Sequence, residues 1–274
     1  MDDGRNGSVK QIICIKWGAK FGPEYVNRLH AMIARNITPP FRLFCFTDDG
    51  TGLHPDVAVR PLPDFAYQAP VNTRGKWPKS RLWGDLGDVT GVVLFLDLDV
   101  IVTGSLDAFF EHGDPDDTIL GLNPNTPFEK MGQTSVYRMR VGNLAPLQKI
   151  FAADPQAAAD KYKYEQRFVT RNAPGGVKFW PSGWLAHFRF HCVPTFPLNY
   201  LRDPKIPRGT RIVMFPGSLN PPDAILGRWD EADEARAPLD HLRAAFTGQR
   251  REGFLKHLRH YVRPTPWVAQ LWRE

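Results

Sequence analysis

Two aspartates at the end of an apolar run are the residues of this sequence whose spacing most suggests chemistry. Asp97 and Asp99 end the string VVLFLDLD, and residues 92–96 are typical of a strand buried on both faces. Residues i and i+2 of an extended strand share a face, so we expect both carboxylates to point to one place. They repel each other unless a cation lies between them, and their oxygens suit Mg²⁺ or Mn²⁺. The pair predicts a metal site that can shield a departing diphosphate. The structural alternative is that one aspartate caps a turn and the other pairs with a nearby Lys or Arg.

Alternating strands and helices place this pair at a sheet edge. We expect strands at 11–16, 42–47, 57–60 and 92–96, with helices at 23–36 and 79–87. Such alternation implies parallel strands, and ligands of open parallel sheets bind beyond the carboxyl ends of the strands. The aspartates stand at such an end, so the topology and the chemistry indicate one location.

The second half is less regular. We expect strands at 117–122 and 134–140, and helix over 143–172 with an interruption near Pro155. Residues 173–222 are rich in Pro and Gly, and a basic helical segment covers 238–260, after which Pro264 and Pro266 should break any helix. The chain is therefore divided into a main domain at 8–237 and a helical, basic C-terminal extension at 238–274.

Composition sets broad limits. Hydrophobic residues make up 42% and charged residues 23% of 274 residues, which suits a globular protein with a sizeable core. The net charge of +6 favours anionic partners, but the basic residues form no nucleic-acid-binding motif, so we expect none. No signal peptide or membrane-spanning run is visible, which favours the cytoplasm or the cytoplasmic face of a membrane. The three cysteines are scattered and predict buried, reduced thiols.

Four blocks of the sequence resemble glycosyltransferases of the GT-A type, especially those similar to family 8. They are KWPKSRLW at 76–83, LFLDLDVIVTGSLD around the aspartates, TSVYRMRVG at 134–142 and YEQRFV at 164–169. The resemblance implies a Rossmann-like mixed sheet flanked by helices. It also implies metal-dependent transfer of a sugar, with retention, from a nucleotide donor such as a UDP-sugar to a glycan or lipid-linked acceptor. Synthesis of a cell-surface polysaccharide is the process that this activity suggests.

The chain departs from that family at one string. Family 8 has a late H-x-x-G-x-x-K-P segment, and the corresponding residues 214–221 read MFPGSLNP. Met214 takes the place of the metal-binding histidine and Asn220 that of the phosphate-binding lysine, and a thioether is a poor ligand for a hard cation. A non-catalytic module that binds sugar nucleotides or glycans is therefore an alternative. A haloacid dehalogenase-type phosphohydrolase, which also uses a D-x-D, is a less favoured one.

The resemblance also assigns roles beyond the metal. Lys16, Thr47 and Asp48 stand at the ends of the first two strands, where the donor nucleotide is expected, and Lys79 or Arg81 is expected to hold a phosphate. Arg81 is favoured because its guanidinium can bind in a bidentate manner. Glu165 and Gln166 are expected beside the anomeric carbon as catalytic residues, together with Asp97 and Asp99. Caps, solvated loops and exposed helix faces are the structural alternatives for these positions.

Two basic segments remain. The run HFRFHC alternates like a strand, so residues 187, 189 and 191 would share a face suited to a diphosphate or a metal. We expect Arg189 at the donor phosphates, and the alternative is that the histidines are structural. Residues 241–274 contain seven Lys or Arg and two Asp or Glu, interleaved with aromatic residues. This tail predicts either peripheral contact with an anionic membrane or a helix packed on the core with its charges outward.

Overall fold

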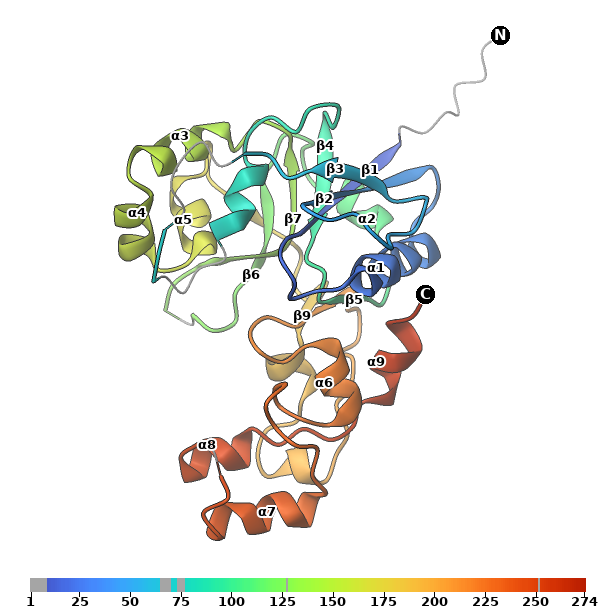
Figure 1. Ribbon diagram of the computed structural model, residues 1–274, viewed down its shortest axis with the longest axis vertical. Helices are drawn as coiled ribbons and strands as arrows, with labels where there is room; N and C mark the ends of the chain where they lie inside the picture. The colour runs from blue at the N-terminus through green and yellow to red at the C-terminus, as the bar shows by residue number, and fades with distance from the viewer. Residues whose placement is uncertain (1–8, 65–69, 73–76, 127, 251) are drawn as a thin grey trace. The chain divides into compact units, whose positions relative to one another are not determined.

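The computed structural model describes residues 9–64, 70–72, 77–126, 128–250 and 252–274 in two compact units (Figure 1). The first unit comprises residues 1–30, 37–98 and 106–181, and the second comprises 31–36, 99–105 and 182–274. The predicted boundary between 237 and 238 lies inside the second unit. Lys76, which begins one of the blocks noted above, lies outside the described residues.

The first unit is built on a mixed sheet, as expected. Within the described residues its seven strands have the order β3-β2-β1-β4-β7-β6-β8. The strands β1, β2, β3 and β4 are parallel, and β7 pairs with β4 in the antiparallel direction. The bounds are Lys10–Lys16 (β1), Phe41–Thr47 (β2), Ala58–Pro61 (β3), Val92–Leu96 (β4), Ile119–Leu122 (β6), Gly132–Arg140 (β7) and Lys178–Phe179 (β8). Apolar β-branched and aromatic runs form the central strands because both faces of the sheet are buried.

Three helices cover part of this sheet. α3 (Ala145–Ala153), α4 (Pro155–Tyr162) and α5 (Glu165–Asn172) lie together (Figure 1), and the break at Pro155 confirms the predicted interruption. Asp154 caps α4 by accepting a hydrogen bond from the backbone of Ala157. The aromatic rings of Trp77 and Phe151 stack at 4.6 Å in the core beneath them, an arrangement that stabilises the unit beyond simple area burial.

The remaining helices of the first unit are α2 (Asp107–Glu111) and α1 (Pro23–Asn36), whose last six residues belong to the second unit. Pro23 occupies the start of α1, as its fixed φ predicts. The helix expected over 79–87 is shorter than predicted: only Trp77–Leu82 is helical, as a 3-10 turn named η1. Gly84 and Gly87, the latter with φ +68°, follow it in the turns before β4 and favour its early end.

The second unit contains a small sheet with the order β5-β10-β9. These strands are Val100–Val102 (β5), Leu185–His187 (β9) and Ile212–Met214 (β10). In this unit α6 (Pro221–Leu226) packs on α9 (Pro266–Leu271), and α7 (Pro238–Phe246) packs on α8 (Phe254–Arg259). No helix in the described ranges has both the length and the apolar character needed to cross a bilayer.

Three predictions in the second unit were wrong. The run from His187 is a strand only to that residue, and Phe188–Cys192 form a π-helical turn, so residues 187, 189 and 191 do not share a strand face. The helix at 238–260 is two helices, because Gly248 (φ +76°) and Gly253 lie between them. Pro266 begins α9 instead of ending a helix. Proline has no backbone N–H, but the first turn of a helix has no intrahelical acceptor for that group, so proline is tolerated there.

Candidate active site

The carboxyl ends of β1 and β2 bring together three residues predicted to bind the donor. Lys16 and Thr47 lie side by side in the parallel ladder, and both side chains are buried. The ammonium group of Lys16 and the hydroxyl of Thr47 both donate to the carbonyl of Asp49, at 3.1 and 2.9 Å. The carboxylate of Asp48 accepts the backbone N–H of Gly18 at 2.9 Å. These contacts fix the two loops at the sheet edge where open α/β sheets bind ligands.

Asp97 lies at the end of β4, the neighbour of β1. Its backbone N–H donates to the carbonyl of Ser135 in β7 at 2.9 Å. Its carboxylate accepts from the ammonium group of Lys79 at 2.7 Å, and that group also reaches the carbonyl of Thr134 at 3.3 Å. The Lys79 side chain is 8% exposed and that of Asp97 is 20% exposed. The aspartate is thus partly open to solvent while its cationic partner is buried.

Lys79, and not the favoured Arg81, is the residue of η1 that meets the aspartate. The guanidinium of Arg81 donates instead to the backbone carbonyl of Pro63 at 2.7 Å. In a 3-10 turn, residues two apart differ by about 240° around the axis, so the side chains of Lys79 and Arg81 leave η1 in different directions.

Asp99 lies in a turn. Leu98 and Asp99 connect β4 to β5, so the assumption of an extended strand through both aspartates was wrong. The chain passes from the first unit into the second between Leu98 and Asp99, so the two aspartates belong to different units. The sequence pattern placed Asp97 correctly at the strand end but gave no sign of this turn.

The chemistry of the side chains fits a hard divalent cation only in part. The carboxylate oxygens of Asp97 and Asp99 are suitable ligands for Mg²⁺ or Mn²⁺. Met214 adds nothing, because its thioether is buried in β10 between the partner residues Val100 and His187.

Glu165 is a buried acid in the first unit. It begins α5, is 4% exposed and accepts a hydrogen bond from the hydroxyl of Thr134 at 2.7 Å. Burial raises its pKa to about 7, against the opposing effects of the Lys79 charge and the Thr134 hydrogen bond. The exposed-helix alternative for Glu165 was therefore wrong. Gln166 follows it and is half-buried.

Thr134 is a site residue that the sequence reasoning missed. Its backbone carbonyl faces Lys79 and its hydroxyl faces Glu165, so it links the two ionisable groups. The signal was present in the polar run from Gln133 to Ser135 inside a strand that is otherwise rich in large side chains. Polar residues at fully buried strand positions usually have a hydrogen-bonding role.

Arg189 in the second unit lies against the divergent 214–221 string. Its guanidinium stacks on the Trp229 ring at 4.6 Å and donates to the hydroxyl of Ser218 at 2.9 Å. Gly217 has φ +104°, and a Cβ added there would lie 3.8 Å from the guanidinium. Asn220, at the family lysine position, precedes α6 and donates its backbone N–H to Asp223 at 2.9 Å. A cation therefore lies beside this loop although Asn220 supplies none.

The two histidines near Arg189 are joined by a hydrogen bond. The imidazole of His191 accepts the backbone N–H of His187 at 2.9 Å. Burial, with the charge of Arg189, lowers the pKa of His187 to about 3, so this ring is neutral at physiological pH.

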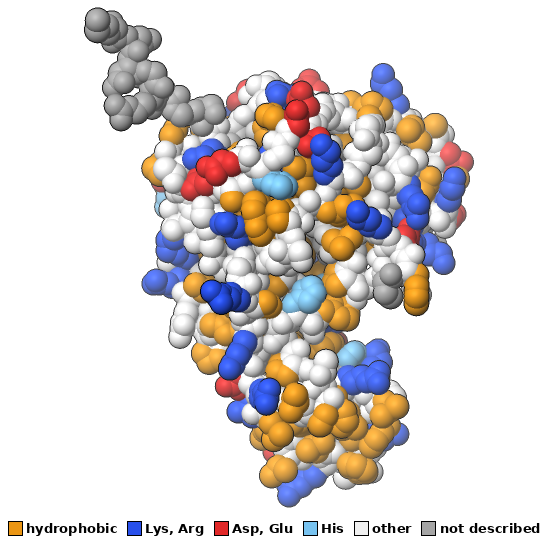
Figure 2. All heavy atoms as spheres, turned by 180° about the vertical axis from the view of Figure 1, so that it is seen from behind, with side chains coloured by type: hydrophobic (Ala, Val, Ile, Leu, Met, Phe, Trp, Pro, Cys, Tyr) orange, Lys and Arg blue, Asp and Glu red, His pale blue; other side chains and the backbone are white. Residues whose placement is uncertain are grey.

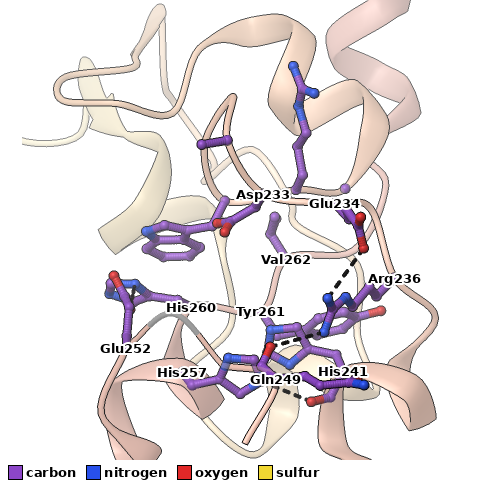
Figure 3. Close-up of a pocket in the computed structure, with 14 residues that line it drawn as sticks. Asp233, Glu234, Arg236, His241, Gln249, Glu252, His257, His260, Tyr261 and Val262 are labelled. Carbon is purple, nitrogen blue, oxygen red and sulfur yellow. Dashed lines mark hydrogen bonds and ion pairs between the residues drawn. The ribbon is translucent and has the colours of Figure 1, made fainter. Parts of the chain in front are cut away.

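A polar cavity of about 200 Å³ also lies in the second unit (Figure 3). The rings of His241 and His257 stack at 3.9 Å, and Glu252 contacts His260 at 2.7 Å. Its carboxylates outnumber its guanidinium groups: the charged lining residues are Asp233, Glu234, Glu252, Arg228 and Arg236. Such a lining does not suit a diphosphate, which requires an excess of positive charge.

The fold and this arrangement define the class: the chain has the GT-A type of fold found in glycosyltransferases. The galactosyltransferase LgtC, solved with donor and acceptor sugar analogues, superposes with a TM-score of 0.54 at 14% identity, over 95% of this chain and 100% of that one. An active-site variant of LgtC, glutamine to glutamate, gives 0.53 at 13% identity over the same shares. The bifunctional glycosyltransferase WbbM gives 0.57 at 12%, over 96% of this chain and 51% of that one.

The similarity is one of fold, since the sequences have diverged widely. The glycosyltransferase GlyE of Streptococcus pneumoniae TIGR4 gives a TM-score of 0.53 at 10% identity, over 97% of this chain and 65% of that one. No family model matches the sequence. No curated protein matches it either.

Proposed function

We propose that this chain is a metal-dependent glycosyltransferase that moves a sugar from a UDP-sugar to a glycan or lipid-linked acceptor, with retention of the anomeric configuration. The observation that carries the proposal is Asp97 at the carboxyl end of β4, beside the edge formed by Lys16 and Thr47, in a GT-A type of fold. The proposed setting is the cytoplasmic face of a membrane, in the synthesis of a cell-surface polysaccharide.

Asp97 and Asp99 are proposed to hold Mn²⁺ or Mg²⁺, which when bound supplies charge neutralisation for the departing diphosphate. Lys16, Thr47 and Asp48 are proposed to bind the base and ribose at the edge of β1 and β2. Lys79 orients the Asp97 carboxylate through its 2.7 Å contact. This role differs from the phosphate contact expected of the 76–83 segment, because the ammonium group is buried.

Gln166 is proposed to face the anomeric carbon, where an amide oxygen stabilises the positive charge that develops on the sugar. An active-site glutamine of LgtC, the one changed in its solved variant, supports this role. Glu165 is proposed to act beside it as a buried acid held by Thr134, and it anchors the first turn of α5 on which Gln166 lies.

Arg189 is proposed to bind the donor phosphates. Its guanidinium lies beside Gly217 and Ser218, in the string that in family 8 carries the phosphate-binding lysine. Planar guanidinium groups bind phosphate in a bidentate manner, so Arg189 is a chemically sound replacement for the lysine that Asn220 lacks.

The tail is proposed to contact an anionic membrane through α7 and α8. Leu239, Phe246 and Leu255 are exposed there, near Arg243 and Lys256. Figure 2 shows hydrophobic side chains gathered at the end that carries these helices, with Lys and Arg among them. Other aromatic residues of the tail, Tyr261 and Trp272, are buried and cannot contribute. Sedimentation with vesicles containing phosphatidylserine, compared with phosphatidylcholine vesicles, tests this contact.

A screen of nucleotide-sugars with and without Mn²⁺ tests the activity, by thermal shift and by release of the nucleotide. We expect one UDP-sugar to raise the melting temperature only with the metal. Asp99→Ala is expected to abolish this metal-dependent shift and turnover while the protein remains folded, whereas the surface control Asp160→Ala retains both. Full Mn²⁺-dependent activity in Asp99→Ala would refute the proposal. Binding without turnover by the wild-type protein would favour the alternative of a non-catalytic sugar-nucleotide-binding module.

A further inference from the structure

A second group of metal-binding side chains lies in the first unit, apart from the aspartates. In the part of the chain that the structure describes, His30, His54 and Asp56 form the one group of three His, Cys, Asp or Glu residues whose potential ligand atoms all lie within 4.8 Å of one another. His30 is on α1, and the other two belong to the connection between β2 and β3. None of the three takes part in the site described above.

A network of hydrogen bonds brings this connection to the helix. Asn27 lies one turn before His30, on the same side of α1. Its side-chain oxygen accepts the backbone N–H of His54 at 2.8 Å, and its side-chain nitrogen donates to the carbonyl of Gly52 at 3.0 Å. The backbone that carries His54 is thus fixed against α1 by a residue other than the three.

The rings of the group are placed so that they can bind a cation. Neither ring nitrogen of His30 has a hydrogen-bond partner among the described residues. The two rings stack at 4.8 Å, and Nδ1 of His54 lies 3.8 Å from the carboxylate of Asp56.

We propose that His30, His54 and Asp56 form a binding site for a divalent transition-metal ion of the Zn²⁺ or Ni²⁺ class, with water as a fourth ligand. Two imidazoles and a carboxylate are typical of zinc, whereas Mg²⁺ and Mn²⁺ prefer oxygen ligands like those of Asp97 and Asp99. The two sites therefore differ in the ions that they select.

The geometry requires a small closure. Tetrahedral zinc with bonds of about 2.1 Å holds its ligand atoms about 3.4 Å apart, so the widest separation in the group must shorten by no more than about 1.4 Å. The side chains of His54 and Asp56 are 43% and 74% exposed, and an ion bound at Nδ1 of His54 takes the place of the hydrogen bond that this atom accepts from the backbone N–H of Asp56 at 3.2 Å. The bound ion ties α1 to the β2–β3 connection, which continues from Asp48 and Asp49 at the sheet edge.

Calorimetric titration of the untagged full-length protein with ZnCl₂ tests the proposal. We expect the wild-type protein to bind one zinc ion, and His54→Ala and Asp56→Asn each to weaken this binding by more than about tenfold. The matched control His112→Ala removes a histidine of the same unit outside the group and should bind zinc like the wild-type protein. His54 and Asp56 are on an exposed loop, and circular dichroism verifies that the variants are folded.

Asp99→Ala separates this site from the proposed catalytic one. It should retain zinc binding and lose the Mn²⁺-dependent effect of a nucleotide-sugar. The proposal is overturned if the wild-type protein binds no zinc, if His54→Ala binds it as tightly as the wild-type protein, or if zinc binding is lost in Asp99→Ala. Because zinc binding is measured without a nucleotide-sugar, failure of the proposed enzymatic function leaves this result intact.

Discussion

The ammonium group of Lys79 lies 2.7 Å from the carboxylate of Asp97, and the lysine is the more deeply buried of the two. A buried ammonium without a partner is costly, so each residue depends on the other for its place at the end of β4. The ammonium group of Lys79 also neutralises the charge of the Asp97 carboxylate. The same contact thus bears on stability and on the proposed site.

Lys79→Met removes the charge and keeps most of the side-chain volume. We expect the free energy of unfolding to fall by about 1–3 kcal/mol, less than for a fully buried pair because Asp97 is partly exposed. Urea denaturation measures this loss. The double variant Lys79→Met with Asp97→Asn should recover part of it, because neither charge is left alone. Strictly additive losses would show that the two side chains do not interact in solution.

Glu165 should make stability depend on pH in a specific window. The pKa is about 7 in the folded protein and 4.5 in the reference state. Between these values the folded protein holds a proton that the unfolded chain has lost, so stability falls as the pH rises from 4.5 to 7 and is constant on either side. The difference of 2.5 units amounts to about 3 kcal/mol.

Glu165→Gln isolates this effect because glutamine does not titrate. The variant should gain stability relative to the wild-type protein as the pH rises, by up to about 3 kcal/mol at pH 8 compared with pH 4.5. Urea denaturation of both proteins across this range measures the difference, which cancels the other titrating groups. Parallel stability curves would show that Glu165 has an ordinary pKa and is solvated.

The success and failure of the sequence-based reasoning have one physical cause. The continuous apolar run of β4 and the proline at the start of α1 are local signals, and both elements formed where expected. Lys79 and Glu165 both contact Thr134 of β7. Lys79 is 55 residues from Thr134 along the chain, and Glu165 is 31 residues from it. Such tertiary contacts leave no periodic pattern in a single sequence.

The alternating run from His187 to Cys192 shows the converse error. Its pattern of large and polar residues has the period of a strand, yet the chain turns after β9 and the side chain of Arg189 reaches Trp229 and Ser218. Ser218 lies 29 positions and Trp229 lies 40 positions after Arg189 in the sequence. The sequence therefore identified Arg189 as a candidate but could not predict the contacts that place it.

Gly217 should be intolerant of a side chain. Its φ of +104° is outside the region that other residues adopt without strain, so Gly217→Ala is expected to cost about 1–3 kcal/mol of folding stability. Gly253→Ala is the matched control: its φ is −60° and nothing lies within 4 Å of the added Cβ. Gly253 is the N-cap of α8, where alanine is less favourable than glycine, so thermal or urea denaturation should show a loss for the control that is smaller than that for Gly217→Ala. Equal effects of the two substitutions would mean that the 214–221 loop is not held in this conformation.

Replacement of Arg189 by lysine or by methionine should weaken binding of the donor. Lysine keeps the charge but loses the planar stacking on Trp229 and the forked geometry beside Ser218, so we expect UDP-sugar binding in the presence of Mn²⁺ to weaken by about tenfold. Methionine removes the charge and should weaken it further, while Ser218→Ala, which leaves the guanidinium on Trp229, should have a smaller effect. Calorimetry gives the dissociation constants, and the emission of the tryptophans reports whether the stacked arrangement survives. Wild-type affinity in Arg189→Met would exclude the guanidinium from the donor site and leave its role as a purely structural contact of the second unit.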